Sequence, residues 1–135
     1  MIIAENLHRS YAIGHKTVEV LHGLSLHIQM QGGQSILFDM GQTDLLLRNA
    51  EKLNVDLTDV DIAVLSHGHY DHAGGLRRFL TLNDHAPVYV SRHAFGDYYN
   101  GEEKYIGLDW ELLNSAQIDG FIADDQSVAG DDAFV

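Results

Sequence analysis

The stretch that decides the fold runs Ser66-His67-Gly68-His69-Tyr70-Asp71-His72-Ala73-Gly74-Gly75, directly after the apolar run Ile62-Ala63-Val64-Leu65. The apolar run has the length and branching of a buried β-strand. The histidines and the aspartate therefore follow the end of a strand. In α/β sheets ligands gather at such ends, because the rigid sheet holds loops that are free to carry polar groups.

The spacing of these polar residues predicts a metal site. His67 and His69 are two apart, so in an extended loop their rings point to the same side and can hold one ion together. Asp71 and His72 are adjacent and diverge, so they can offer an oxygen and a nitrogen to a second ion. Neutral imidazole and ionised carboxylate suit zinc, and also iron or manganese. The alternative is a solvated, histidine-rich loop that binds no metal.

Two further features support a site at this position. Asp39 ends the apolar run Ser35 to Phe38, and a carboxylate beside a metal loop can accept a hydrogen bond from a ligand histidine and fix its orientation. The alternative role of Asp39 is to cap the turn. Gly68 is expected to let the backbone bend between the first two ligands, and Gly74-Gly75 to let it pass close to the site.

These motifs resemble a known family. His67-Gly-His69-Tyr-Asp71-His72 with Ala73-Gly74-Gly75 resembles the H-x-H-x-D-H signature of the metallo-β-lactamase superfamily of metal-dependent hydrolases. Ile36-Leu37-Phe38-Asp39-Met40-Gly41 is similar to the strand and Asp-Thr-Gly turn before that signature, with Met40 in place of threonine. The resemblance extends from about Leu21 to Gly107. Its flanking segments look most like the dihydropterin ribofuranosyl-aminobenzene phosphate synthase subgroup; they are His22-Gly23-Leu24-Ser25, Asp44 to Leu53 and Val64-Leu65-Ser66.

The resemblance implies an α/β fold, namely half of a metallo-β-lactamase-type αβ/βα sandwich, a mixed sheet with helices on one face. Residues 1–135 would form a single domain that corresponds to the N-terminal half. By similarity, His67 and His69 would hold the first of two divalent ions, with zinc expected. Asp71 and His72 would bind the second, and Asp39 would support the site from beneath. The remaining ligands of the family come from its C-terminal half, so a homodimer or a complementary second chain is expected to supply them.

The implied function is a metal-dependent hydrolase, in which a metal-activated water attacks an ester, phosphoester or amide-type bond of a small-molecule substrate. Asp71 is also expected to act in catalysis by accepting a proton from that water. The alternative is a non-catalytic half-domain that dimerises or pairs with a complementary chain. A fragment of a longer enzyme is a third possibility.

The net charge of the sequence argues against two classes of partner. Twenty acidic and eight basic residues give a net charge of −12 with neutral histidines, so the overall field repels phosphate backbones and anionic membranes. We therefore expect no nucleic acid and no membrane as partners. The 135-residue sequence has no cysteine and no apolar run near the ~20 residues of a membrane span. A cytoplasmic location is the default expectation.

The rest of the chain is expected to complete one layered unit. Alternation from Leu24 to Met30 predicts a strand that pairs through a glycine turn with Ser35 to Phe38. A helix capped by Thr43 should follow, and a second helix should run from about Ala73 to Thr81. Val88 to Val90 should form a strand parallel to Ile62–Leu65, with His85 at the opposite edge from the metal loop.

The ends of the chain carry weaker signals. Met1 to Val20 shows no period and is expected to be an irregular arm, except for a short strand at Ile2-Ile3. Arg92 and His93 could face substrate; the alternative is a surface helix start with Ser91 as its cap. Aromatic residues near Tyr98 suit a loop that covers substrate or one that packs on the domain. Phe121 to Ala123 should form a last strand, whose edge invites a partner.

Overall fold

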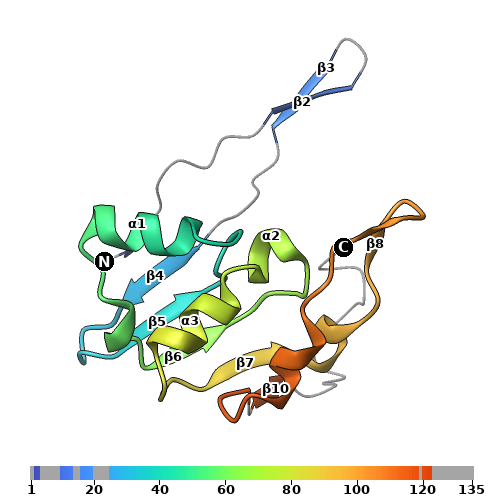
Figure 1. Cartoon of the computed structure of the whole chain (residues 1–135). Helices are drawn as coiled ribbons and strands as arrows, with labels where there is room; N and C mark the ends of the chain where they lie inside the picture. The colour runs from blue at the N-terminus through green and yellow to red at the C-terminus, as the bar shows by residue number, and fades with distance from the viewer. Residues whose placement is uncertain (1, 4–9, 14–15, 20–24, 119, 123–135) are drawn as a thin grey trace.

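The computed structural model describes residues 2–3, 10–13, 16–19, 25–118 and 120–122, and the side chains of 25–91 and 93–118. One six-stranded sheet, in the order β1-β4-β5-β6-β7-β10, organises this part of the chain (Figure 1). Its strands are β1 (Ile2–Ile3), β4 (Leu26–Gln29), β5 (Ser35–Phe38), β6 (Ile62–Val64), β7 (Val88–Ser91) and β10 (Gly120–Ile122). β5, β6, β7 and β10 are parallel, whereas β1 and β4 pair in antiparallel fashion. The mixed sheet is therefore confirmed.

The predicted hairpin is formed by β4 and β5. Ile28 pairs with Ile36, and Leu26 pairs with Phe38. The turn closes where the Met30 amide donates to the Gln34 carbonyl at 2.8 Å. The alternating pattern and the glycines between the strands were sufficient signals for this unit.

Helices α1 (Leu45–Leu53) and α3 (Leu76–Leu82) lie on the same face of the sheet (Figure 1). They bury Leu46, Ala50, Leu76 and Phe79 in one core with strand residues such as Leu37. The short helix α2 (Tyr70–Ala73) and the 3₁₀ helices η1 (Leu57–Asp59), η2 (Arg92–Phe95) and η3 (Trp110–Asn114) complete the helical elements that the structure describes. The predicted placement of helices on one face is confirmed.

Two helix predictions were wrong in detail. α1 begins after Asp44, and Thr43 is not its cap, because Thr43 has a left-handed backbone with φ of 47°, whereas a capping residue is usually extended. The helix predicted from Ala73 to Thr81 is broken at Gly74-Gly75 into α2 and α3. The break follows a close approach, since a Cβ on Gly75 would lie 2.4 Å from the Met40 carbonyl oxygen.

The irregular arm predicted for residues 1–20 was wrong for the residues that are described there. β1 pairs with β4 as the expected short strand, but β2 (Ser10–Ile13) and β3 (Lys16–Glu19) form an antiparallel hairpin with Tyr11 opposite Val18. The sequence did contain a signal, because a glycine followed by one further residue, as in Gly14-His15, is typical of two-residue hairpin turns. A further hairpin joins β8 (Tyr99–Asn100) to β9 (Lys104–Tyr105).

The last predicted strand is β10, which pairs in parallel with β7. Residues 123–135, including Ala123 and the acidic end of the chain, lie outside the described residues. No helix in the described part of the chain is long and apolar enough to cross a membrane.

The face of the sheet away from the helices is apolar and only partly covered. Strand alternation directs Leu37, Ala63, Val88 and Val90 into the core, where they are buried. The intervening residues form what we call the open face; all are partly exposed, and Tyr89 is 40% exposed. Its members on β4 to β7 are Leu26, Ile28, Ile36, Phe38, Ile62, Val64 and Tyr89, and the strand register makes them neighbours across four strands.

Replacing Gly68 with alanine tests how the loop after β6 packs. The sequence suggested that Gly68 allows a bend, but the structure shows a close approach: an added Cβ would lie 1.7 Å from the Ala94 carbonyl oxygen in η2. We expect Gly68→Ala to lower the free energy of unfolding by about 1–3 kcal/mol, because the loop and η2 must separate. Denaturant unfolding followed by circular dichroism measures this change.

Gly32→Ala is the matched control. Gly32 lies in the turn between β4 and β5, and an added Cβ there meets no atom within 4 Å. We expect this variant to change stability by less than about 0.5 kcal/mol. Equal effects of the two substitutions would contradict the packing of Gly68 on η2.

Candidate metal centre

The candidate centre lies where two parallel strands end side by side. Phe38 at the end of β5 is in register with Val64 at the end of β6. The next residue, Asp39, donates its amide to the Val64 carbonyl at 2.9 Å, and the Met40 amide donates to the His72 carbonyl at 2.6 Å. The segment after β5 is thereby fixed to the end of β6 and to α2, which carries Asp71 and His72.

Three histidines and an aspartate converge in this loop. One ligand atom from each of His67, His69 and Asp71 lies within 4.8 Å of the others. The His72 ring centroid is 4.1 Å from that of His67, and its Nε2 is 3.8 Å from an Asp71 carboxylate oxygen. The structure thus brings together all four residues singled out in the sequence. Asp71 is close to His67 and His69 as well as to His72, whereas the spacing had suggested that Asp71 acts together with His72 alone.

The donor set fits a divalent ion. Imidazole nitrogens and a carboxylate are the ligands that zinc, iron and manganese accept in proteins. Two metal–ligand bonds of about 2.1 Å at a tetrahedral angle place their ligand atoms about 3.4 Å apart, so atoms that lie up to 4.8 Å apart must approach one another for all three to hold one ion. The cluster is also accessible, because His67, His69 and His72 are each partly exposed.

Asp39 lies beneath the cluster and is 2% exposed. Its Oδ1 accepts the Ser66 amide at 2.8 Å, while its Oδ2 accepts the Ser66 hydroxyl at 2.7 Å and contacts His72 Nδ1 at 2.9 Å. One carboxylate therefore both caps the turn after β6 and orients a histidine. The capping role considered from the sequence concerned the turn after Phe38, whereas the described contacts of the carboxylate are with Ser66 and His72.

The two histidines nearest Asp39 have opposite pKa shifts. The hydrogen bond to Asp39 is the main cause that raises the pKa of His72 above its ordinary value of 6.5. Burial, followed by the nearby His72 and His69, lowers the pKa of His67. In the metal-free protein His72 is thus the histidine that holds a proton more tightly.

The weaker candidates Arg92 and His93 lie in η2. Ser91 caps this helix by accepting the His93 amide at 3.2 Å, as the alternative interpretation proposed. The His93 side chain is exposed and is not among the residues whose ligand atoms converge. The Arg92 side chain lies outside the described part of the structure.

Tyr98 is a neighbour of the centre. Its ring meets the His69 ring edge-on, with centroids 5.1 Å apart, and its hydroxyl donates to the His93 carbonyl at 2.5 Å. The segment before β8 therefore packs on a candidate ligand. Sequence reasoning had named Tyr98 only as one aromatic among several.

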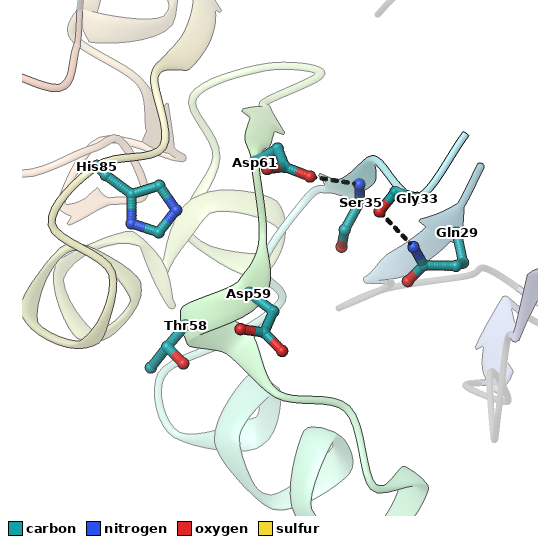
Figure 2. A pocket seen from close by; sticks show the side chains of 7 residues that line it. All are labelled: Gln29, Gly33, Ser35, Thr58, Asp59, Asp61 and His85. Carbon is teal, nitrogen blue, oxygen red and sulfur yellow. Dashed lines mark hydrogen bonds between the residues drawn. The ribbon is translucent and has the colours of Figure 1, made fainter. Parts of the chain in front are cut away.

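His85 lies at the opposite end of the sheet, as predicted. It lines a surface hollow of about 390 Å³ together with Ser35, which begins β5, and Asp61, which precedes β6 (Figure 2). The Ser35 amide donates to the Asp61 carboxylate at 2.8 Å. Because the metal loop follows the other end of β6, His85 is distant from the cluster.

Comparison with known proteins decides the family. The model of the metallo-beta-lactamase superfamily matches residues 18–127. This chain belongs to that superfamily. The resemblance stated from the sequence is confirmed, and the match extends further toward the C-terminus than the motifs had indicated.

Superfamily relatives include two proteins of Methanocaldococcus jannaschii. An uncharacterised protein is 41% identical over 93 residues, which make up 67% of this chain and 35% of that protein. The 7,8-dihydropterin-6-methyl-4-(beta-D-ribofuranosyl)-aminobenzene-5'-phosphate synthase is 30% identical over 90 residues, 63% of this chain and 31% of the synthase. The chain therefore spans about a third of the length of these two curated relatives.

A solved structure supports the same assignment. The crystal structure of a metal-dependent hydrolase of the beta-lactamase superfamily is 36% identical, with a TM-score of 0.57 over 84% of this chain and 39% of that one. The subclass B3 metallo-beta-lactamase of Bradyrhizobium japonicum, at 23% identity and a TM-score of 0.51, covers 64% of this chain and 35% of its own. The second match shows only the shared fold.

Asp39→Asn tests the electrostatic role of Asp39 in the metal-free chain. Loss of the carboxylate charge should lower the pKa of His72 toward 6.5, because the Asp39 contact is what raises it. Site-resolved NMR titration of the imidazoles measures this pKa. The His72–Asp39 pair stabilises the folded state at pH below 6.5, and this stabilisation is lost as the pH rises through the raised pKa of His72.

His67 has to be followed separately in that titration, because its pKa is shifted in the opposite direction and Asp39 also acts on it. Its lowered pKa destabilises the fold as the pH falls below 6.5, so the two histidines oppose each other in any global stability profile. Only the residue-specific titration separates them. An unchanged pKa of His72 in the variant would show that Asp39 does not control it.

Proposed function

We propose that this chain is a metal-dependent hydrolase that acts on an ester, phosphoester or amide-type bond of a small molecule. The observation that carries the proposal is the convergence of His67, His69, Asp71 and His72 above the buried Asp39. Membership of the superfamily and the match to a metal-dependent hydrolase support it.

In this proposal His67 and His69 hold one divalent ion, and Asp71 and His72 bind a second, with zinc expected and iron or manganese as alternatives. When bound, such ions lower the pKa of a water and polarise the substrate oxygen. Asp71 has a second role, which is to accept a proton as that water attacks. Its carboxylate is suited to this role because it is nearly buried yet lies beside three partly exposed imidazoles.

Substrate contacts are proposed for η2 and the segment that follows it. The loop that carries the histidines packs on η2, where Gly68 lies against the Ala94 backbone. Arg92 and His93 directly precede Ala94 in the sequence. Tyr98 already covers one edge of His69. A substrate that binds at the histidines would therefore meet this segment first.

A partner that packs on the open face is part of the proposal. Seven apolar side chains line this face across β4 to β7, with Tyr89 among the large hydrophobic residues that are exposed. Contiguous apolar surface of this kind marks interaction sites. A second copy or a complementary chain would cover it and could supply further ligands to the ions.

The first test is metal binding by the purified chain, with zinc and manganese as probes. We expect tight binding that His67→Ala weakens by at least about tenfold, because a direct ligand is lost. His85→Ala is the control, since His85 is exposed at the other end of the sheet. Calorimetry and elemental analysis measure affinity and content.

Hydrolysis is measured on the same samples with p-nitrophenyl acetate and bis-p-nitrophenyl phosphate. We expect turnover that a chelator removes and added metal restores, and that Asp71→Asn reduces by at least about a hundredfold. Equal metal binding by the wild type and His67→Ala would contradict the assigned ligands. Tight binding without hydrolysis in any assembly state would favour a non-catalytic domain.

Tyr89→Lys tests the open face. If a second copy packs there, a charge at this position should reduce the mass of the chain in solution from dimer to monomer, because a buried lysine lacks a partner. Light scattering coupled to gel filtration measures the mass. Leu82→Lys is the matched control, because Leu82 is 46% exposed on α3 in the helical layer. A monomeric wild type would exclude self-association and leave a complementary chain.

A further inference from the structure

We infer that Ser66 is a positioning residue that fixes the tautomer of His67 by connecting its ring to Asp39. The inference rests on the proposed metal centre, since it concerns which ring nitrogen His67 presents to an ion. It assigns a role to a residue that lies within the sequence motifs but was given no function there.

The Ser66 hydroxyl has a single proton to donate. Ser66 Oγ lies 2.7 Å from Asp39 Oδ2 and 2.9 Å from His67 Nδ1. The carboxylate can only accept, so the hydroxyl proton must point toward Asp39. If it pointed toward His67 instead, two oxygens would face each other at 2.7 Å with no proton between them.

This direction of the hydroxyl proton determines which nitrogen of His67 carries a hydrogen. With its proton committed to Asp39, Ser66 Oγ can only accept from the ring, so His67 Nδ1 must carry a hydrogen. Nε2 of the neutral ring then has its lone pair free for a cation. A neutral imidazole in water favours the other tautomer, with the hydrogen on Nε2. The contact with Ser66 therefore selects the form that can bind a metal through Nε2.

The same carboxylate oxygen acts on His72 without an intermediary. Asp39 Oδ2 lies 2.9 Å from His72 Nδ1, so this nitrogen also carries the hydrogen and Nε2 is again the free atom. His72 Nε2 lies 3.8 Å from the Asp71 carboxylate, on the side of the cluster. Asp39 Oδ2 thus fixes the tautomers of two rings, that of His72 by direct contact and that of His67 through Ser66.

His69 provides an internal contrast. Within the described part of the chain its ring contacts are the rings of His67 and Tyr98, and no hydrogen bond to a ring nitrogen is formed. Ser66 therefore acts on His67 and not on His69, the other histidine beside Gly68. A substitution of Ser66 that changes the tautomer of His67 but not that of His69 therefore acts through the Ser66–His67 contact and not through a general disturbance of the loop.

The test uses the full metal-free chain, labelled with ¹⁵N, at a pH above the imidazole range. Two-bond ¹H–¹⁵N spectra report the tautomer of each ring. We expect His67 to be the Nδ1–H form in the wild type and to shift toward a mixture in Ser66→Ala, with His69 unchanged. Ser66→Thr keeps a hydroxyl and should restore the wild-type spectrum. The Ser66 amide contact to Asp39 remains in all variants, so the turn is retained.

Zinc affinity is measured in parallel. We expect Ser66→Ala to weaken binding about 10- to 100-fold, the usual effect of removing a partner of a ligand histidine, and Ser66→Thr to restore it. An unchanged His67 tautomer in Ser66→Ala, or a change that threonine does not reverse, would overturn the inference. A wild type that shows the predicted tautomer but binds no zinc would instead contradict the proposed function while the role of Ser66 remains.

Discussion

The site depends on one buried carboxylate. Asp39 is 2% exposed, and burial of an ionised carboxylate is costly unless donors surround it. Its two oxygens accept hydrogen bonds from the amide and hydroxyl of Ser66, which follows β6, and contact the ring of His72 in α2. The residue also has a left-handed backbone with φ of 56°, a conformation that costs about 1–2 kcal/mol. These contacts offset that cost and join three segments at one point.

Parallel strands make this arrangement possible. Since β5 and β6 run in the same direction, residues that follow them in the chain meet at the same edge although Asp39 and Ser66 are 27 residues apart. The backbone extends the junction, because Gly41 and Ala73 form a bridge and the Gly75 amide donates to the Gly41 carbonyl at 3.1 Å. The close passage of Gly75 over Met40 explains why the helix after the metal loop is interrupted.

The sequence predicted most of the sheet, because alternation and short apolar runs are local signals. It predicted the four converging residues from their spacing within one loop. It missed Ser66, whose role depends on a contact made only after folding. Thr43 was wrongly assigned as a cap, since its left-handed backbone is set by the turn after Asp39. Asn83 was also missed: it is buried, and its side chain donates to the Leu57 and Val60 carbonyls and accepts the Ala86 amide.

The four candidate ligands are held with unequal rigidity. His67 and His72 are connected to the buried Asp39, whereas His69 contacts the ring of Tyr98, whose hydroxyl donates to the carbonyl of the exposed residue His93 in η2. The Tyr70 amide, next to His69, donates to the Ile106 carbonyl just after β9. Contacts with the buried Asp39 therefore orient His67 and His72, whereas contacts with Tyr98 and Ile106 position His69 and the residue after it. In the proposed function the same segments carry the substrate contacts, so substrate that binds there would act on His69 before it acts on His67 and His72.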